Sequence, residues 1–189
     1  GVLACNLSGP RRIARGAARD HFLGVHGVSG RGEAFKSGGR VVKNVTGYDM
    51  SKLLAGSFGT LAAMTEVTLK VLPAPERTRT VLIAGLADGA AIEALAQAAG
   101  SSHDVTGLAH LPAPAAARSA VSYVAGAGGA VTALRLEGPG PSLAQRCRAL
   151  RDEFFAFGPV EELHSTNSAT LWREVGEVAL LGGGDSVLW

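Results

Sequence analysis

The clearest alternation of apolar and polar residues lies in residues 61–72, just before Pro73. The apolar positions are Val67, Leu69 and Val71, and the polar positions between them are Glu66, Thr68 and Lys70. A period of two that uses β-branched residues predicts a strand with one buried face and one exposed face. This long strand ends a stretch, residues 38–73, around which the rest of the chain is organised.

A strand over residues 38–42 and a short helix over residues 50–55 are predicted earlier in the same stretch. Asp49 or Ser51 can cap the start of the helix, and Gly56 can supply the left-handed residue that ends it. The glycine turns on both sides of this helix bring several backbone N–H groups into one region, which suits an anion or a flat polar ring system. An ordinary strand–helix–strand unit with tight turns explains the same pattern.

The first 37 residues predict a turn, a basic segment and a β-hairpin. The apolar start of the chain runs into a turn at Ser8–Pro10, and the arginines that follow are spaced to share one helical face. Phe22–Val28 is typical of a strand, and the glycines of Ser29–Glu33 are typical of a hairpin turn into Ala34–Ser37. The arginines concerned are Arg11, Arg15 and Arg19.

After a stiff connector at Pro73–Arg77, strand and helix patterns alternate. Strands are predicted over residues 80–86, 105–111, 119–124, 130–136 and 160–163, and helices over residues 90–99, 141–157 and around 171–178. The first helix is expected to bury Ile92, Leu95, Ala96 and Ala99, and the second Leu143, Cys147, Leu150, Phe154 and Phe157. The order βαβ, β, βαβ predicts a ferredoxin-like α/β sandwich and an α+β fold class, with domains at residues 1–74 and 75–189.

Charge and cysteine content exclude several kinds of protein. The 18 basic and 16 acidic residues leave a small net charge, which argues against a nucleic-acid or anionic-membrane surface. Cys5 and Cys147 are far apart, and the five histidines have no ligand spacing, so neither a metal site nor an iron–sulfur site is predicted. No apolar run approaches the roughly 20 residues of a membrane helix, and no signal peptide is predicted. We expect a cytoplasmic protein with reduced thiols.

The motifs of residues 1–75 resemble those of FAD-binding domains of the vanillyl-alcohol-oxidase (PCMH) type. They are Asn6-Leu7-Ser8-Gly9, then Lys43-Asn44-Val45-Thr46-Gly47-Tyr48-Asp49, then Gly56-Ser57-Phe58-Gly59-Thr60-Leu61 and a strand ending in proline. Within that superfamily the segment is most similar to the smaller FAD-binding subunit of bacterial glycolate oxidase. The resemblance implies the second half of a flavin domain followed by a cap domain, in a chain that begins inside a domain and ends in an interrupted strand at Ser186–Trp189.

The resemblance also implies a set of flavin-contacting residues. Backbone near Val25 and at Met64–Thr65 is expected to face the adenine, and Arg15-Gly16 to lie near the flavin. The full set is Asn6, Ser8, Gly9, Arg15, Gly16, Val25, Lys43, Asn44, Thr46, Gly47, Tyr48, Met64 and Thr65. No catalytic base is identified, although His110 and His164 lie in the expected cap domain.

By resemblance, the function expected is hydride transfer from glycolate or a similar 2-hydroxy acid to FAD. The implied partners are a larger flavin subunit and an iron–sulfur subunit that passes electrons to the membrane pool. No nucleic acid is expected as a partner. The subunit would then be peripheral to the inner membrane through its partners. Two alternatives stay open: a non-catalytic interaction subunit with a vestigial flavin site, and a stand-alone FAD-dependent dehydrogenase of the D-lactate type. With half of the flavin domain absent, the chain alone is expected to be inactive and to hold FAD weakly.

Overall fold

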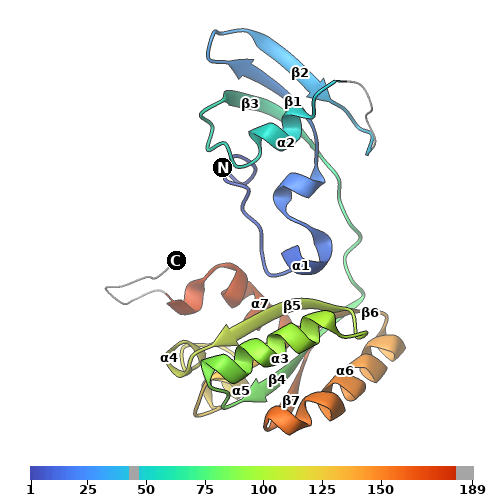
Figure 1. The fold of residues 1–189 in the computed structure, drawn as a ribbon, viewed down its shortest axis with the longest axis vertical. Coiled ribbons are helices and arrows are strands. Elements are labelled where there is room, and N and C mark those ends of the chain that lie inside the picture. Colours follow the sequence, from blue (N-terminus) through green and yellow to red (C-terminus); the bar gives the residue numbers. More distant parts are fainter. Residues whose placement is uncertain (43–46, 182–189) are drawn as a thin grey trace. The chain divides into compact units, whose positions relative to one another are not determined.

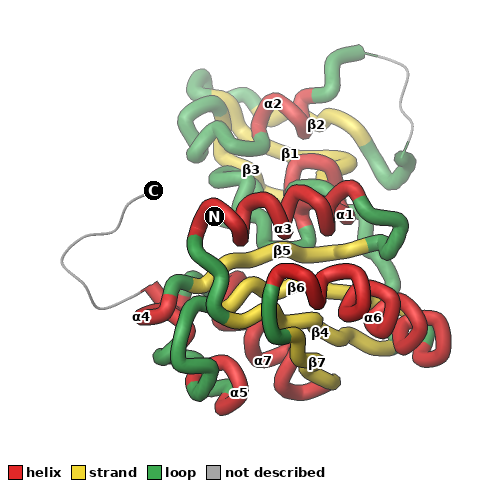
Figure 2. Tube along the Cα trace, turned by 60° about the horizontal axis from the view of Figure 1, so that its bottom comes forward, coloured by secondary structure: helices red, strands yellow, loops and turns green. Residues whose placement is uncertain are grey.

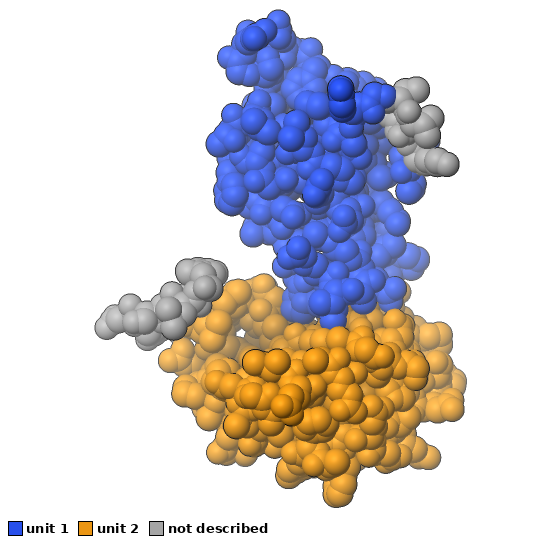
Figure 3. Space-filling view, viewed as in Figure 1, with its two compact units in different colours: residues 1–73 blue, residues 74–189 orange. Residues whose placement is uncertain are grey.

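A computed structural model describes residues 1–42 and 47–181 of the chain, which divides into two compact units (Figures 1 and 3). Unit 1 is Gly1–Pro73 and unit 2 is Ala74–Trp189. The division falls one residue before the expected domain boundary. The predicted contact residues Lys43, Asn44 and Thr46 lie outside the described residues, as does the strand expected at residues 186–189.

Unit 1 contains a three-stranded antiparallel sheet in the order β2-β1-β3. Its strands are β1 (Phe22–Ser29), β2 (Ala34–Gly38) and β3 (Ala62–Leu69). The predicted hairpin between β1 and β2 is confirmed, because the Ser29 N–H donates to the Glu33 carbonyl at 2.9 Å across the turn. Residues 39–42, which were expected to continue a strand, lie outside β2.

The short helix of unit 1, α2 (Met50–Leu54), begins as predicted. The Asp49 carboxylate accepts a hydrogen bond from the Lys52 N–H at 3.2 Å, which satisfies one of the free donors of the first turn. After the helix, Gly56 adopts φ +82°, a left-handed conformation that suits glycine.

The basic segment does not form the continuous helix that its arginine spacing predicts. Helix α1 covers only Arg12–Arg15, Gly16 follows with φ +84°, and a separate 3₁₀ helix, η1, covers Ala18–His21. Arg11, Arg15 and Arg19 therefore do not share one helical face. The left-handed glycine breaks the backbone periodicity on which that prediction depended.

The burial of β3 also differs from its sequence pattern. Its expected buried side chains Val67 and Leu69 are 42% and 46% exposed, and Val71 beyond the strand is 84% exposed. β3 is an edge strand of this sheet. The small core of the unit lies elsewhere and consists of Leu3, Phe22, Val25, Leu54 and Ala62.

Unit 2 has the predicted ferredoxin-like topology, and the α+β fold class is confirmed. Its antiparallel sheet has the order β5-β6-β4-β7, in which each βαβ half contributes one central and one outer strand. The strands are β4 (Arg77–Ala84), β5 (Val105–Leu111), β6 (Val131–Gly138) and β7 (Val160–His164).

Helices cover both faces of the unit 2 sheet (Figure 2). On one face lie α3 (Asp88–Gly100) and α6 (Gly140–Phe154), which η2 (Phe155–Phe157) continues. On the other lie α4 (Ala113–Ala116), α5 (Ser122–Ala125), α7 (Ser165–Gly176) and η3 (Ala179–Leu181). Each face has its own cluster of buried apolar side chains. Among the described residues, no helix is both long and apolar enough to cross a bilayer.

Two predictions for unit 2 were wrong. The strand expected at residues 119–124 is instead a turn leading into α5, because β5 pairs directly with β6 and leaves no place for a strand between them. Helix α3 buries Ala91, Ala94 and Ala98, whereas Ile92 is 66% exposed. The small alanine side chains let the helix lie close to the sheet, which the larger apolar residues could not do.

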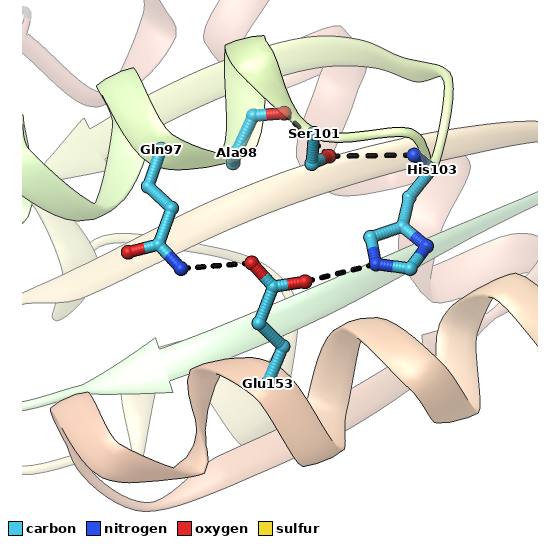
Figure 4. Close-up of polar contacts among 5 residues, drawn as sticks. All are labelled: Gln97, Ala98, Ser101, His103 and Glu153. Atoms are coloured by element: carbon cyan, nitrogen blue, oxygen red, sulfur yellow. Dashed lines mark hydrogen bonds and ion pairs between the residues drawn. The ribbon is translucent and has the colours of Figure 1, made fainter.

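A polar clasp joins the end of α3 to α6 (Figure 4). The Gln97 amide donates to Glu153 Oε1 at 2.8 Å, and His103 Nε2 lies 3.0 Å from Glu153 Oε2. The hydrogen bond from Gln97, and after it the contact with His103, lowers the pKa of the Glu153 carboxyl below its ordinary value.

Candidate functional site

The first turn of unit 1 is held to the start of η1 by two of the predicted site residues. Asn6 Oδ1 accepts from the Arg19 N–H at 2.9 Å, and Ser8 Oγ accepts from the Ala18 N–H at 3.0 Å. Ser8 also donates to the Asn6 carbonyl at 3.2 Å. Both side chains therefore fix the turn itself, and their role in this structure is to position its backbone against η1.

Gly16 is fixed in place by Asp20. The Asp20 carboxylate accepts from the Ala17 N–H at 2.7 Å, and a Cβ at position 16 would lie only 2.9 Å from Asp20 Oδ2. A side chain there would meet this contact as well as the cost of φ +84°. Position 16 therefore favours glycine, both for its backbone conformation and for the limited space beside Asp20.

His21 ties the arginine segment to the end of the long strand. Its Nε2 lies 2.8 Å from the Arg15 carbonyl and its Nδ1 lies 3.2 Å from the Lys70 carbonyl. Carbonyl oxygens only accept hydrogen bonds, so both contacts are hydrogen bonds at once when both ring nitrogens carry hydrogen. His21 is therefore a structural residue, and it connects the arginine segment to the residues that follow β3.

A basic pocket of about 410 Å³ opens between these elements, and we call it the arginine pocket. Three guanidinium side chains line it, together with apolar walls and open backbone at Gly9, where an added Cβ would meet nothing within 4 Å. No aspartate or glutamate is among its lining residues. Its main side chains are those of Arg11, Arg12, Arg15, His21, Val71 and Leu72.

An apolar pocket of about 580 Å³ adjoins the arginine pocket, since Ala18 and His21 line both. Apart from the His21 ring, its lining consists of glycine and apolar residues from the start of the chain and from β3. They include Val2, Leu3, Met64, Val67 and Leu69. The exposed face of β3 is therefore one wall of a hydrophobic pocket next to a cluster of cations.

The expected adenine contacts lie on two different kinds of strand. Val25 is on β1, the central strand, where it is paired with both Ser37 and Val67 and its side chain is buried. The expected adenine contact at Val25 thus falls on a strand that has a neighbouring strand on each side. Met64 and Thr65 are on β3, which is an edge strand of the described sheet.

Gly47 and Tyr48 are the predicted contact residues of the Lys43–Asp49 motif that the structure describes. Gly47 has φ +79°, and the Tyr48 side chain is 92% exposed. An exposed phenol and a left-handed glycine are compatible with a loop that faces a ligand.

The histidines of unit 2 have different surroundings. His110 Nδ1 lies 2.9 Å from Thr132 Oγ1 and its Nε2 lies 3.3 Å from Asp88, whereas the His164 side chain is 59% exposed. In the part of the chain that the structure describes, no group of three or more His, Cys, Asp or Glu residues is placed to hold a metal ion.

Sequence reasoning missed Asp20, Val71 and Leu72 as parts of the site. The Asp20 carboxylate accepts a hydrogen bond from the Ala17 N–H, directly after Gly16. The two apolar residues follow the end of β3. Val71 and Leu72 come directly before the proline that ends the motif strand, whereas Asp20 stands in none of the quoted motifs. The sequence signal for this region was a glycine directly after Arg15. The periodicity of the sequence does not reveal that this glycine has a left-handed conformation.

Comparison with known proteins gives a consistent picture over part of the chain. The chain is 49% identical over 75 residues to glycolate oxidase subunit GlcE of Escherichia coli (strain K12), a match that covers 40% of this chain and 21% of that protein. It is 39% identical over 77 residues to glycolate oxidase subunit GlcD of Bacillus subtilis (strain 168), covering 41% and 16%. A D-lactate dehydrogenase of Anaerostipes hadrus is 40% identical over 83 residues, covering 44% and 18%.

The fold is similar to that of a solved alkyldihydroxyacetonephosphate synthase, with a TM-score of 0.67 over 96% of this chain and 36% of that one. The sequence identity there is 18%, so this likeness concerns the fold alone. No family model matches the chain. The matched stretch spans 16–21% of the length of these relatives. Over the matched stretch, the chain is similar to proteins named as glycolate oxidase subunits and as FAD-linked oxidoreductases.

Proposed function

We propose that this chain is part of an FAD-binding oxidoreductase subunit that oxidises glycolate or a similar 2-hydroxy acid. The observation that carries the proposal is the pair of adjoining pockets in unit 1, one lined by arginines and one by apolar residues. They lie in the unit that contains the motifs shared with flavin-dependent relatives.

The described residues fit a flavin nucleotide in two respects. A large apolar surface beside a polar one suits a flat aromatic ring system that is attached to a charged chain. A guanidinium group presents a planar fork to phosphate or carboxylate oxygens, and the open backbone at Gly9 leaves room for a ligand to approach closely. Met64, Val67 and Leu69 would face the ring system, and Arg12 and Arg15 would face anionic groups.

FAD, when bound, supplies the hydride acceptor. The residues of this chain contribute orientation, exclusion of water and positive charge. The hydrogen bonds of Asn6, Ser8, Asp20 and His21 hold the turn that carries the arginines, so little reorganisation is needed when an anion binds. Lys43, Asn44 and Thr46 remain proposed contacts of the flavin.

In this proposal the chain belongs to a complex. GlcE and GlcD are named as subunits of glycolate oxidase. We propose a larger flavin subunit and an iron–sulfur subunit as the partners of this chain. In this proposal the chain is cytoplasmic and is held near the membrane by those partners. The exposed apolar side chains of unit 1 support a role in which other polypeptide covers part of it.

A second candidate is a stand-alone D-lactate dehydrogenase, which the relative from Anaerostipes hadrus favours. The two candidates differ in the substrate and in the need for partner subunits, and they share the flavin.

The test is the visible absorption spectrum of the complete natural protein that contains this chain, before and after anaerobic addition of glycolate or D-lactate. We expect a yellow protein whose flavin absorption bleaches with glycolate. Bleaching by D-lactate alone would replace the first candidate by the second. A protein that stays colourless after incubation with FAD would refute both and leave a non-catalytic interaction subunit.

A further inference from the structure

We infer that His21 is a pH-sensitive latch in unit 1. Its ring joins the arginine segment (residues 11–16) to the residues after β3 through two contacts, and it can make both only while each ring nitrogen carries a hydrogen. When the ring loses one of these hydrogens, one of the two contacts is released. This switch does not depend on which ligand the protein binds, so it goes beyond the proposed function.

His21 contacts two groups that can only accept hydrogen bonds. Its Nε2 lies 2.8 Å from the Arg15 carbonyl oxygen, and its Nδ1 lies 3.2 Å from the Lys70 carbonyl oxygen. A neutral imidazole donates from only one of its nitrogens, and the other nitrogen presents a lone pair. In the neutral ring, this lone pair would face a carbonyl oxygen and repel it. Only the imidazolium, which has two N–H groups, makes both hydrogen bonds at once.

His110 of unit 2 has partners of a different kind. Its Nδ1 lies 2.9 Å from Thr132 Oγ1, and its Nε2 lies 3.3 Å from Asp88 Oδ1. The Thr132 hydroxyl can donate as well as accept, so a neutral ring satisfies both contacts by donating to Asp88 and accepting from Thr132. His110 therefore keeps its two contacts without a second ring hydrogen, whereas His21 does not.

A very short helix carries the Arg15 carbonyl. α1 has only four residues, and a single helical turn is marginal in water, so its stability depends on contacts with the rest of unit 1. The side chains of Asn6 and Ser8 accept hydrogen bonds from N–H groups of η1, not of α1. Release of the Arg15 carbonyl should therefore loosen α1.

The other side of the latch has a second connection. The Lys70 N–H donates to the His21 carbonyl at 2.8 Å, in addition to the contact between the ring and the Lys70 carbonyl. Val71 and Leu72, which follow Lys70, line the arginine pocket together with His21 and Arg15. Loss of either ring contact thus loosens one side of this pocket.

Charged groups near the ring act on its protonation in opposite directions. Positive charges oppose the imidazolium and negative charges favour it. The nearby cations are Arg11, Arg12 and Arg15, which line the arginine pocket with His21, and Lys70 beyond the end of β3. The nearby anion is Asp20 in η1, and the side chains that line the apolar pocket with His21 are uncharged. The range to examine is pH 5–8, in which histidine side chains titrate.

The experiment is a pH titration of the full chain, followed by NMR of the imidazole nitrogens and by amide hydrogen exchange. We expect both ring nitrogens of His21 to carry hydrogen at the acid end of the range and only one at the alkaline end. Over the same range, either the Arg15 and Gly16 amides or the Lys70 amide should exchange about tenfold faster than the intrinsic pH dependence requires, since a charge-assisted hydrogen bond is lost. The amides that respond identify the contact that opens.

The test variant is His21→Gln, whose amide donor does not change its protonation over this range. We expect the pH-dependent change in exchange to be absent in this variant. The matched control is His110→Gln, which removes another partly buried histidine, from unit 2. In the control, the change at the amides of unit 1 should stay within about twofold of the wild type, because local opening of one unit does not require the other.

Two results would overturn the inference. One is a His21 ring whose protonation stays the same between pH 5 and 8. The other is a wild-type response that persists in His21→Gln, since another titrating group would then be its cause. The nitrogen spectra of the wild type require no substitution, so they decide the matter even where a variant does not fold. None of these measurements uses a flavin or a substrate, so their failure is distinct from failure of the proposed function.

Discussion

The two units of this protein bury their apolar residues very differently. Among the described residues, unit 2 exposes few large apolar side chains, namely Ile92, Tyr123, Phe155, Val178 and Leu181. The shorter unit 1 exposes many more: Val2, Leu7, Ile13, Val41, Val42, Tyr48, Leu53, Phe58, Leu61, Val67, Leu69, Val71 and Leu72.

The difference follows from the way in which each sheet is covered. The four-stranded sheet of unit 2 has helices and a buried apolar cluster on both faces. The three-stranded sheet of unit 1 packs around one small cluster, and part of β3 forms the wall of a pocket. Large exposed apolar surfaces are typical of sites where a ligand or another polypeptide binds. We conclude that unit 2 is stabilised by a core on both faces of its sheet, whereas unit 1 leaves much of its apolar surface exposed.

The largest expected difference between the units is in the reactivity of their cysteines. Cys147 is fully buried, and burial, with the neighbouring Glu162 as a second cause, raises the pKa of its thiol to about 11. Cys5 is partly exposed. At pH 8 in native buffer we expect a thiol reagent to label Cys5 faster than Cys147 by a factor of about 10³ or more, because Cys147 must wait for unit 2 to open.

The control for this experiment is the same labelling in denaturant, where both thiols should react at similar rates. If Cys147 reacted natively as fast as Cys5, the closed core of unit 2 would be contradicted. If Cys5 were as slow as Cys147, unit 1 would be less open than its surface indicates.

Two leucine-to-alanine substitutions, one in each unit, remove the same side-chain atoms and so compare the units directly. Leu150 of α6 is fully buried, whereas Leu69 of β3 is 46% exposed. We expect Leu150→Ala to lower the free energy of unfolding by about 2–5 kcal/mol, through lost burial and a cavity. Leu69→Ala should cost about 1 kcal/mol or less. Urea unfolding followed by circular dichroism measures both, and equal costs would contradict the comparison.

A buried polar chain provides a third test, confined to unit 2. Trp172 Nε1 donates to Thr80 Oγ1 at 2.8 Å, and Thr80 Oγ1 lies 2.7 Å from Ser168 Oγ. Thr80→Val leaves both partners buried without this contact, so we expect a loss of about 1–3 kcal/mol in the free energy of unfolding. Thr78→Val, on the same strand, is the matched control and should change little. A variant as stable as the wild type would show that the chain of hydrogen bonds contributes nothing net.

The smallest expected effect concerns the clasp between α3 and α6. The pKa of the Glu153 carboxyl is lowered in the folded protein, so its contribution is complete above the ordinary pKa of a glutamate and is lost as the pH falls through the lowered value. The carboxylate is partly exposed, and we expect Glu153→Gln to cost only about 0.5 kcal/mol at pH 7. Urea unfolding at several pH values measures this, with Glu161→Gln as the control. A cost that persists unchanged in strong acid would contradict the assignment.

Much of the local structure was determined by the sequence itself. The pattern of residues 105–111 gave the bounds of β5, the pattern of residues 22–28 gave β1 to within one residue, and Asp49 was identified as a cap of α2. These features depend on interactions between residues that are close in the chain, namely alternation, turn chemistry and capping. The order of elements was sufficient for the ferredoxin-like topology of unit 2.

The tertiary structure decided which apolar face is covered and where the site lies. A period shows that a strand or helix has two faces, but only the neighbouring elements determine which one is buried, so Ile92 and Val67 are exposed against expectation. The arginine pocket forms because Gly16 breaks a helix and His21 connects segments that are 49 residues apart in sequence. The sequence thus determined the elements and the motifs of this protein. Contacts between distant residues, which no local pattern encodes, decided how its sheets are covered and which side chains share a pocket.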